Sequence, residues 1–415
     1  MFDVIIIGAG ASGLMCAAAL QRKAKKNPNM LILDANKKAG RKLLATGNGR
    51  CNLTNENMSL EHFHGDTDKL SDLMKEYSYK VTEFFDDLGL LTTADSEGRV
   101  YPYSKQATSV LNILMNNIDC EIKYESAVSS VKKLKNGFEL KTIGGETYQC
   151  KNLVIAGGGA ASPKLSASNN CYKLVESLGH SVTNLYPSLV PMKCEDAFLK
   201  KLAGVRCRAE VSLLDSNKKL LKSEIGELQI TDKTISGICI FNLSPLVAEY
   251  CEKNPKGKGL SVKVDFMPDY SFTEVLDILN RTAKANSKLN ISSLFDGMLN
   301  NKLGFALIQK VGLNPNDSIS KLTSKNIYAL ASSVKGLNLP ISGLKSFDDA
   351  QVTAGGVPLK EININTAESV KCKNLHFCGE ILNINGDCGG YNLHFAWMTG
   401  LCCADALAEK LQTKQ

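Results

Sequence analysis

Residues 2–20 read FDVIIIGAGASGLMCAAAL, and this stretch decides the fold. Its apolar start predicts a buried strand, its three glycines a tight turn, and its alanine-rich end a helix. Gly8 permits the turn, Gly10 lets a phosphate approach the backbone, and Gly13 lets the helix pack closely against the strand. The stretch therefore predicts a dinucleotide-binding unit, with the diphosphate on the free N–H groups of the helix.

A second predicted strand follows the helix at Met30–Leu33 and ends in Asp34. An acid at this place accepts hydrogen bonds from both hydroxyls of an adenosine ribose. A glycine turn alone also occurs by chance in other α/β proteins. Here strand, turn, helix, strand and acid follow in the order that nucleotide binding requires.

Composition bounds the class of protein. The chain has 415 residues, 44% apolar and 22% charged, which predicts a soluble protein of two or three domains. No apolar run approaches the roughly 18 residues of a membrane span, and no signal peptide is recognised, so we expect a cytoplasmic protein without a membrane partner. The 14 dispersed cysteines include no C-x-x-C pair, which favours reduced thiols.

The charge and the histidine content argue against two further classes, nucleic-acid-binding proteins and metal-dependent enzymes. The formal net charge of +7 comes mostly from lysines in short groups, such as those at 23–26, 37–38 and 218–219. Such groups are usually solvated faces, so no nucleic-acid partner is predicted. The five histidines, at 62, 64, 180, 376 and 394, offer no HExxH motif and no obvious catalytic partner. We therefore predict no metal site.

Three segments of the N-terminal half have clear patterns. Residues 39–52, AGRKLLATGNGRCN, predict a loop that wraps a ligand, residues 68–91 an amphipathic helix, and residues 120–150 a hairpin that turns at 135–137. LVIAGGG at 153–159 resembles a second dinucleotide turn, but no acid-tipped strand follows and Pro163 interrupts the expected helix. We interpret it as another strand of the first sheet, so the chain has no nicotinamide domain of its own.

The middle of the chain reads differently. From about residue 190 we expect strands, at 209–214, 219–223, 227–231 and 260–266, and then helices from Ser271, where Glu274 completes a capping box. Past residue 345 the glycine-rich pattern returns.

These changes predict an α/β fold built on a discontinuous, glutathione-reductase-like Rossmann domain at 1–190 and 346–415. An inserted β-barrel-like domain is expected at 191–270 and 336–345, and a small helical subdomain at 271–335. Because ligand pockets favour domain interfaces, the insertion is expected to form a lid or wall of the substrate cleft.

The C-terminal segment discriminates among dinucleotides. A predicted strand at 374–378 ends in Gly379 and Glu380, and glycines at 386–390 open a final helix through residue 408. A nicotinamide domain normally closes within about 150 contiguous residues, so this distant contribution suits a longer cofactor, FAD. Glu380 is then expected to bind ribitol hydroxyls, although a solvated carboxylate is the alternative.

The start of the final helix has a further predicted use. A flavin that accepts hydride develops negative charge, which free N–H groups at a helix N-terminus stabilise. We predict this role for the N–H groups of Tyr391, Asn392 and Leu393, with an ordinary glycine turn as the alternative.

Cations in the glycine-rich loop extend the predicted site. Arg41, Lys42 and Arg50 are predicted to neutralise the diphosphate or to polarise the pyrimidine edge of the flavin. Surface cations are the alternative. Hydride transfer itself requires no protein acid or base, so the catalytic residues stay open. The candidates are Tyr101, Tyr103 and Tyr391, which could stack on a substrate or simply pack.

Several stretches together are more specific than any single motif. They are GAGASGLMCA at 8–17, GRKLLATGNGRCNLTN at 40–55, GRVYPYS at 98–104, VTAGGV at 352–357 and GGYNLHFAWMTG at 389–400. Over nearly its whole length the chain resembles the bacterial BaiN-like flavoproteins, a family that includes aminoacetone oxidase and a bile-acid reductase. The resemblance implies an FAD-binding Rossmann-like domain with a β-barrel-like and a helical insertion.

The motifs and the resemblance together define the predicted cofactor contacts. These are Gly8, Gly10, Ala11, Ser12, Gly13, Asp34, Ala35, Arg41, Lys42, Gly49, Arg50, Cys51, Asn52, Val128, Gly157, Gly379, Glu380, Gly390, Tyr391, Asn392 and Leu393. Asp34 departs from the glutamate that is common at its place. Because aspartate is one methylene shorter, its ribose contact is expected to be looser or water-bridged.

We expect an FAD-dependent oxidoreductase that takes hydride from NADH or NADPH as a transient co-substrate and reduces an unsaturated or carbonyl-conjugated small molecule. The alternative is an oxidase that takes hydride from a small amine, such as aminoacetone, and passes it to oxygen to form peroxide. A tRNA-modifying flavoprotein is a third hypothesis, but the basic residues form no stripe interleaved with aromatic residues. A monomer or a homodimer is expected.

Overall fold

The computed structural model describes residues 1–165, 170–254 and 259–413. The chain divides into two compact units. The first unit comprises Met1–Ser188 and Ala350–Gln415, and the second unit comprises Leu189–Asp349. Within the described residues, no helix combines the length and the apolar character that a membrane crossing requires.

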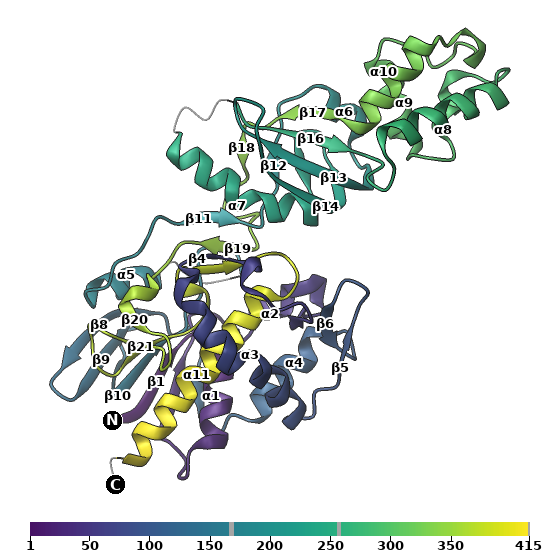
Figure 1. Ribbon diagram of the computed structural model, residues 1–415. Coiled ribbons are helices and arrows are strands. Elements are labelled where there is room, and N and C mark those ends of the chain that lie inside the picture. Colours follow the sequence, from purple (N-terminus) through teal and green to yellow (C-terminus); the bar gives the residue numbers. More distant parts are fainter. Residues whose placement is uncertain (166–169, 255–258, 414–415) are drawn as a thin grey trace. The chain divides into compact units, whose positions relative to one another are not determined.

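The first unit is an α/β structure in which helices pack on a mainly parallel sheet (Figure 1). Its helices are α1 (Ala11–Lys23), α2 (Arg41–Ala45), α3 (Leu70–Asp87), α4 (Ala107–Asn116), α5 (Asn170–Ser177) and α11 (Tyr391–Thr413). Its strands are β1 (Phe2–Ile7), β2 (Met30–Leu33), β3 (Thr54–Asn55), β4 (Phe63–Gly65), β5 (Thr92–Ala94), β6 (Arg99–Pro102), β7 (Glu121–Lys123), β8 (Val128–Leu134), β9 (Gly137–Thr142), β10 (Thr147–Ile155), β11 (Tyr186–Ser188), β19 (Val352–Ala354), β20 (Ile362–Asn363), β21 (Glu368–Ser369), β22 (Leu375–Phe377) and β23 (Ile384–Gly386).

The main sheet of the first unit has nine strands among the described residues, with β20-β21-β22-β10-β1-β2-β7 in order and the β8–β9 hairpin attached to β10. The strands β22, β10, β1, β2 and β7 run parallel. The carboxyl half of β10 reads LVI and is fully buried, and residues 4–7 of β1 and 30–33 of β2 are buried as well. Parallel strands buried on both faces need such continuous apolar runs.

The pairing of β10 with β1 confirms that LVIAGGG belongs to the first sheet and opens no second nucleotide-binding domain. The β8–β9 hairpin and helix α3 are confirmed at the predicted places. Helix α11 packs against α1 and α3, so the C-terminal segment lies directly on the N-terminal βαβ unit (Figure 1). The final helix extends to Thr413, beyond the predicted end at residue 408.

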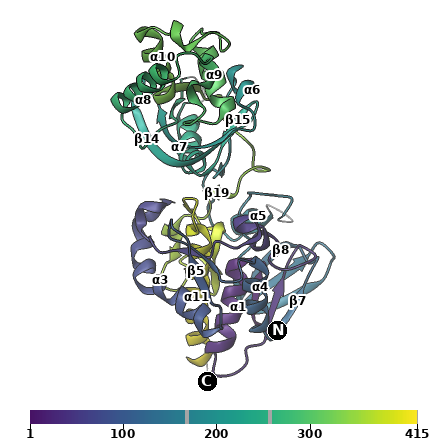
Figure 2. The same ribbon diagram turned by 90° about the vertical axis from the view of Figure 1, so that its right-hand side faces the viewer.

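The second unit combines an antiparallel sheet with helices (Figure 2). Its strands are β12 (Met192–Lys193), β13 (Arg206–Leu214), β14 (Leu220–Ile230), β15 (Thr234–Ser236), β16 (Ser261–Asp265), β17 (Leu337–Pro340) and β18 (Gly343–Leu344). Its helices are α6 (Phe198–Leu202), α7 (Ile238–Lys253), α8 (Phe272–Ala285), α9 (Asn301–Lys310) and α10 (Ser324–Lys335). The strand order among the described residues is β17-β16-β13-β14-β15-β12-β18.

Two sequence expectations in the second unit can be compared directly. The capping box at Ser271 and Glu274 is present at the start of α8. The two strands expected at 219–223 and 227–231 are instead one continuous strand, β14. Gly226, between the two expected strands, pairs with Ala209, so the ladder with β13 continues through it.

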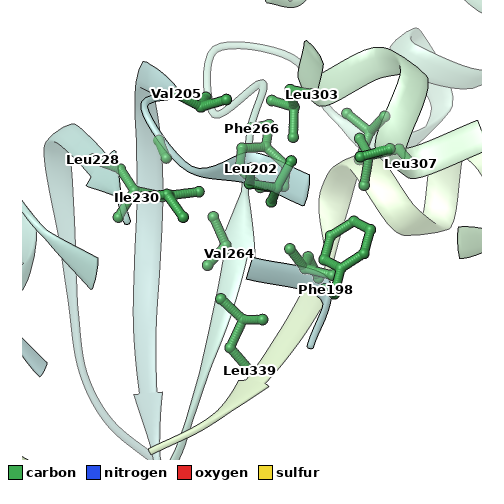
Figure 3. Close-up of a cluster of buried hydrophobic side chains, with 14 of the residues drawn as sticks. Phe198, Leu202, Val205, Leu228, Ile230, Val264, Phe266, Leu303, Leu307 and Leu339 are labelled. Carbon is green, nitrogen blue, oxygen red and sulfur yellow. The ribbon is translucent and has the colours of Figure 1, made fainter. Parts of the chain in front are cut away.

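The sheet and the helices of the second unit share one hydrophobic core (Figure 3). Phe198 and Leu202 of α6 lie with Leu303 and Leu307 of α9 over the side chains of Ile230, Val264 and Leu339 from the sheet. Apolar side chains buried at this density hold the layers together by the hydrophobic effect, at about 25 cal/mol for each Å² removed from water.

Candidate functional site

The glycine turn between β1 and α1 has the geometry that its sequence predicts. Gly8 has φ of +110° and Gly10 forms the N-cap of α1. A Cβ atom on Gly13 would lie 2.0 Å from the Gly8 carbonyl oxygen, so α1 packs on the turn at a distance only glycine allows. A Cβ atom on Gly10 would meet no protein atom within 4 Å. The protein therefore leaves open space in front of the first N–H groups of α1.

Asp34 closes this turn from the end of β2. Its Oδ2 accepts a hydrogen bond from the Ala9 N–H at 2.7 Å, and its Oδ1 accepts one from the Asn36 N–H at 2.7 Å. The residue is only 7% exposed. The Asp34 carbonyl also accepts from the Ser126 N–H at 2.8 Å, which brings the start of β8 beside Ala35. The predicted acid is thus a buried, fixed carboxylate next to the open space.

Glu380 joins three distant segments. Its Oε1 accepts from the Thr353 N–H at 2.8 Å, and its Oε2 accepts from the Gly159 N–H at 3.3 Å. Oε2 also pairs with the Lys42 ammonium at 2.8 Å. The carboxylate, predicted for ribitol, therefore has protein partners from the loop at 39–52, from the glycine run after β10 and from β19. Lys42 thus forms an ion pair with Glu380. Arg41 instead donates hydrogen bonds to Asn36 Oδ1 and to the Lys164 carbonyl.

The Lys42–Glu380 pair yields a measurable coupling. The two side chains are 28% and 22% exposed, so water partly screens their attraction. In a double-mutant cycle with Lys42→Met and Glu380→Gln, we expect a coupling of about 1 kcal/mol in the free energy of unfolding. Urea unfolding of the four proteins measures it. A coupling near zero would show that the two groups meet without stabilising the first unit.

The loop after α2 has an unusual backbone. Gly47, Asn48, Gly49 and Cys51 all have positive φ, between 56° and 83°. Cys51 is completely buried, and burial raises the pKa of its thiol to about 12, against a smaller effect of Thr46. This thiol is therefore a packed, protonated group.

Arg50, the next predicted cation, lies on the surface of the same loop. Its guanidinium carbon lies 5.1 Å from the ring centroid of Tyr101, and its Nε donates to the Gly47 carbonyl at 3.0 Å. Tyr101 is 7% exposed, whereas Tyr103 is 66% exposed. Of the two tyrosines in GRVYPYS, only Tyr101 is packed into the first unit.

Residues 52–55 hold the start of α11. Asn52 accepts from the Gly390 N–H at 3.2 Å when its amide oxygen faces that group, and Asn55 donates to the Gly389 carbonyl at 2.9 Å. Farther along the helix, the indole of Trp397 donates to the Leu53 carbonyl at 3.0 Å. The motif GRCNLTN thus clamps the helix N-terminus, and sequence reasoning assigned this role to neither Leu53 nor Asn55.

The loop before α11 is closed by Asn392. Its side-chain oxygen accepts from the Gly386 N–H at 2.8 Å, and its amide nitrogen donates to the Gly386 and Asp387 carbonyls. The side chain predicted to touch the cofactor therefore fixes the loop that precedes the helix. The backbone N–H groups of the first helical turn have no intrahelical acceptor, as in any α-helix, and are available to a ligand.

A histidine cluster that the sequence did not reveal lies at the same loop. Asp387 is 5% exposed, and its two oxygens pair with His62 Nδ1 at 3.2 Å and His64 Nε2 at 2.7 Å. The ring of Tyr391 stacks on His62 with centroids 4.3 Å apart. The antiparallel pairing of β4 with β23 brings these residues together. Both histidines thus have the carboxylate partner that sequence reasoning did not find.

Two other features of the first unit, a cavity and a cluster of cysteines, have no functional role predicted from the sequence. A cavity of about 600 Å³ lies beside α3, and none of the three tyrosine candidates lines it. Cys16, Cys378 and Cys403 are fully buried with sulfur atoms within 4.8 Å of one another. Burial raises the pKa of Cys378 and Cys403 well above the ordinary value, whereas hydrogen bonds from Cys378 and Cys403 lower the pKa of Cys16 to about 5. All 14 cysteines are free thiols.

Comparison with known proteins identifies relatives over the whole chain. A protein from Clostridium scindens, 3-dehydro-bile acid delta(4,6)-reductase, is 35% identical over 410 residues and the match covers 98% of both chains. Two ribosomal RNA dihydrouridine synthases, from Haemophilus influenzae and Escherichia coli, are each 28% identical, with 98% and 99% of both chains covered.

Solved structures share the fold at low sequence identity. The 3-ketosteroid delta1-dehydrogenase from Sterolibacterium denitrificans superposes with a TM-score of 0.50 at 10% identity and 99% coverage of both chains. The E. coli quinol fumarate reductase gives 0.50 at 14% identity, covering all of this chain and 71% of the other. The family model described as HI0933-like protein Rossmann domain matches residues 2–406. The predicted Rossmann-type α/β fold is thus confirmed, and the chain belongs to the HI0933-like family, as its resemblance to the BaiN-like flavoproteins led us to expect.

Proposed function

We propose that this protein is an FAD-dependent reductase that uses NADH or NADPH to saturate a carbon–carbon double bond conjugated with a carbonyl group in a small molecule. The observation that carries the proposal is the 35% identity, over the whole chain, to a 3-dehydro-bile acid delta(4,6)-reductase. Family membership and a fold shared with other oxidoreductases support the same general class, an FAD-dependent oxidoreductase.

The residues of the first unit fit FAD. The open space at Gly10 admits a diphosphate to the N–H groups of α1, and the buried Asp34 carboxylate lies beside that space with lone pairs for ribose hydroxyls. At the other end of the site, the clamp at residues 52–55 presents the N-terminus of α11. When bound, FAD accepts a hydride and passes it to the substrate.

In the proposed enzyme, the residues of this chain orient the cofactor and stabilise the negative charge that develops on it. The positive end of the α11 dipole and the N–H groups of Tyr391, Asn392 and Leu393 stabilise negative charge near the flavin pyrimidine. Because Asn52 and Asn55 hold the N–H and the carbonyl of the peptide that joins Gly389 to Gly390, the backbone that enters α11 is fixed before a ligand binds. Such preorganisation costs no rearrangement during the reaction.

A second candidate is an RNA-directed reductase. Two relatives at 28% identity are named ribosomal RNA dihydrouridine synthases, and the chain has a formal net charge of +7. Dihydrouridine also arises by saturation of a double bond conjugated with a carbonyl, so both candidates share one reaction type and differ in substrate. The higher identity to the bile-acid enzyme favours the small molecule.

Anaerobic rapid mixing tests the proposed function. We expect NADH or NADPH to bleach the flavin absorbance of the FAD-loaded protein, and a 3-oxo-4,6-diene bile acid to restore it within seconds. Small amines such as aminoacetone are expected to leave the oxidised flavin unchanged. Bleaching by amines but not by nicotinamides would establish the oxidase instead. Restoration by ribosomal RNA alone, with dihydrouridine found in the product, would establish the RNA-directed enzyme.

A further inference from the structure

Saturation of a conjugated double bond requires a proton as well as a hydride. The carbon remote from the carbonyl gains the hydride that originates in NADH or NADPH, and the carbon next to the carbonyl gains a proton. The sum is one reduced nicotinamide and one proton consumed for each double bond saturated. The reaction assigned under the proposed function thus needs a proton source, which a positioned side chain supplies faster than water by about 10²–10⁴-fold.

Most acids and bases of the first unit are unsuited to this task. Burial lowers the pKa of His394 to about 3 and that of His376 to about 4, so both imidazoles are neutral near pH 7. Burial raises the pKa of Tyr391 to about 12, helped by Asp387 and Glu61, which makes its phenol a weaker acid than usual. The buried ring of His180 already uses both nitrogens, Nδ1 in a hydrogen bond with Glu361 and Nε2 in one with Ser369.

His62 and His64 differ from these groups because each bonds a nearly buried carboxylate. An Asp387 oxygen accepts a hydrogen bond from each ring, which fixes the orientation and the tautomer of the imidazole. The two side chains are 22% and 31% exposed, so a proton lost to a substrate can be replaced from solvent.

The two histidines differ in whether the second nitrogen of the ring has a protein partner. His62 Nε2 lies 3.1 Å from the Asn57 amide nitrogen, a donor, so this ring nitrogen already has a protein partner. His64 bonds Asp387 through Nε2, and within the described residues its Nδ1 has no hydrogen-bond partner. A protonated His64 therefore carries one N–H that no protein group uses.

The cluster belongs to the loop that opens α11. Asp387 lies three residues before Gly390, and Asn392 bonds both Gly386 and the Asp387 carbonyl, so the carboxylate is fixed relative to the helix N-terminus. Tyr391, the first residue of the helix, stacks directly on His62. The cluster therefore adjoins the helix end that faces the flavin under the proposed function.

We propose that His64 donates, from Nδ1, the proton that accompanies hydride transfer to the substrate, and that Asp387 is its positioning residue. The proton leaves His64 for the carbon next to the carbonyl, His64 becomes the neutral imidazole that still donates from Nε2 to Asp387, and solvent restores the proton. His62 and Tyr391 hold Asp387 and the loop in place. This inference rests on the proposed function.

Separating the two half-reactions tests the proposal. In FAD-loaded His64→Gln, flavin bleaching by NADH or NADPH is expected within twofold of wild type, since that step requires no proton from the protein. Reoxidation by the 3-oxo-4,6-diene bile acid is expected to fall at least 100-fold. Asp387→Asn, which changes the hydrogen-bond partner that orients His64, should slow reoxidation by about tenfold or more while leaving flavin bleaching within twofold of wild type. Glu61→Gln, an exposed change beside the cluster, should leave both steps within twofold.

The pH profile gives a second readout. Charged and titratable groups around His64 and His62 are Asp387, Glu61, Tyr391 and Cys388. In wild type, reoxidation should decline as the pH rises, because a general acid donates only in its protonated form, and in His64→Gln the decline should disappear. Reoxidation by His64→Gln within threefold of wild type would overturn the inference. Failure of the wild type itself to be bleached by nicotinamides, or to reduce the bile acid, would instead overturn the proposed function and the inference with it. His64→Asn serves the same test if the glutamine variant does not retain FAD.

Discussion

Gly10→Ala is expected to weaken FAD binding by about 10- to 100-fold without destabilising the apo-protein, whereas Gly13→Ala is expected to destabilise the first unit itself. The two changes add the same methyl group three residues apart. At Gly10 the methyl enters space that no protein atom occupies within 4 Å, and the backbone there, with φ of −89°, accepts alanine. At Gly13 the methyl would lie 2.0 Å from the Gly8 carbonyl oxygen.

The physical reasons for the two losses differ. A methyl on Gly10 holds a diphosphate away from the N–H groups of α1 and removes one charge-assisted hydrogen bond, worth about 1.5–3 kcal/mol or about 10- to 100-fold in affinity. A methyl on Gly13 forces α1 away from β1, and overpacking of this kind costs about 1–3 kcal/mol or more.

Two measurements on each variant separate these outcomes. Urea unfolding of the apo-proteins should give wild-type stability for Gly10→Ala and a clear loss for Gly13→Ala. Fluorescence titration with FAD should then show weakened binding by the folded Gly10→Ala protein. Binding of FAD by Gly10→Ala at wild-type affinity would contradict the placement of the diphosphate at this turn.

Glu361→Gln is expected to lower the free energy of unfolding by about 3 kcal/mol at pH 7, and the difference should vanish toward pH 2. Glu361 is 5% exposed and accepts hydrogen bonds from His180 and Ser181, besides pairing with Lys371. Burial alone raises the pKa of this carboxyl, but Lys371, Ser181 and His180 outweigh burial and lower the pKa to about 2.

The sign of the pH effect follows from the ionised form. Since the folded state lowers the pKa from 4.5 to about 2, it favours the carboxylate, and the stabilisation is complete above about pH 5 and is lost as the pH falls toward 2. Burial also lowers the pKa of His180, so protonation of this imidazole adds to the acid sensitivity of both proteins.

Urea unfolding of wild type and Glu361→Gln at pH 7, 5, 4 and 3 measures the difference. The matched control is Glu176→Gln, an exposed glutamate on α5, whose effect should stay within about 0.5 kcal/mol at every pH. A difference between wild type and Glu361→Gln that is constant from pH 7 to pH 3 would show that the carboxylate charge contributes nothing.

Much of the fold could be predicted because its signals are local. The strand β1, the turn at Gly8 and the start of α1 follow from an apolar run and from glycines whose missing side chains permit the geometry. The capping box of α8 is likewise recognisable from four consecutive residues of the sequence. Local signals failed in the second unit, where two expected strands, at 219–223 and 227–231, are the single strand β14.

The candidate site was predictable only in part. The buried carboxylate of Asp34 follows from its place after β2, but the partners of Glu380 do not, since Lys42 lies 338 residues away in the sequence. Asp387 and His64 are 323 residues apart and meet through β4 and β23, which have three residues each. Strands this short show no periodicity from which pairing can be predicted.

The sequence by itself determined the first strand, turn and helix, the hairpin of β8 and β9, and that its two ends build one nucleotide-binding fold, because apolar periodicity and glycine act over a few neighbouring residues. It did not give α7, which lies in a region expected to be rich in strands. Only the tertiary structure decided which carboxylate meets which cation or imidazole. Those contacts join segments hundreds of residues apart, and their geometry depends on how the sheet orders its strands and on how α11 packs against α1 and α3.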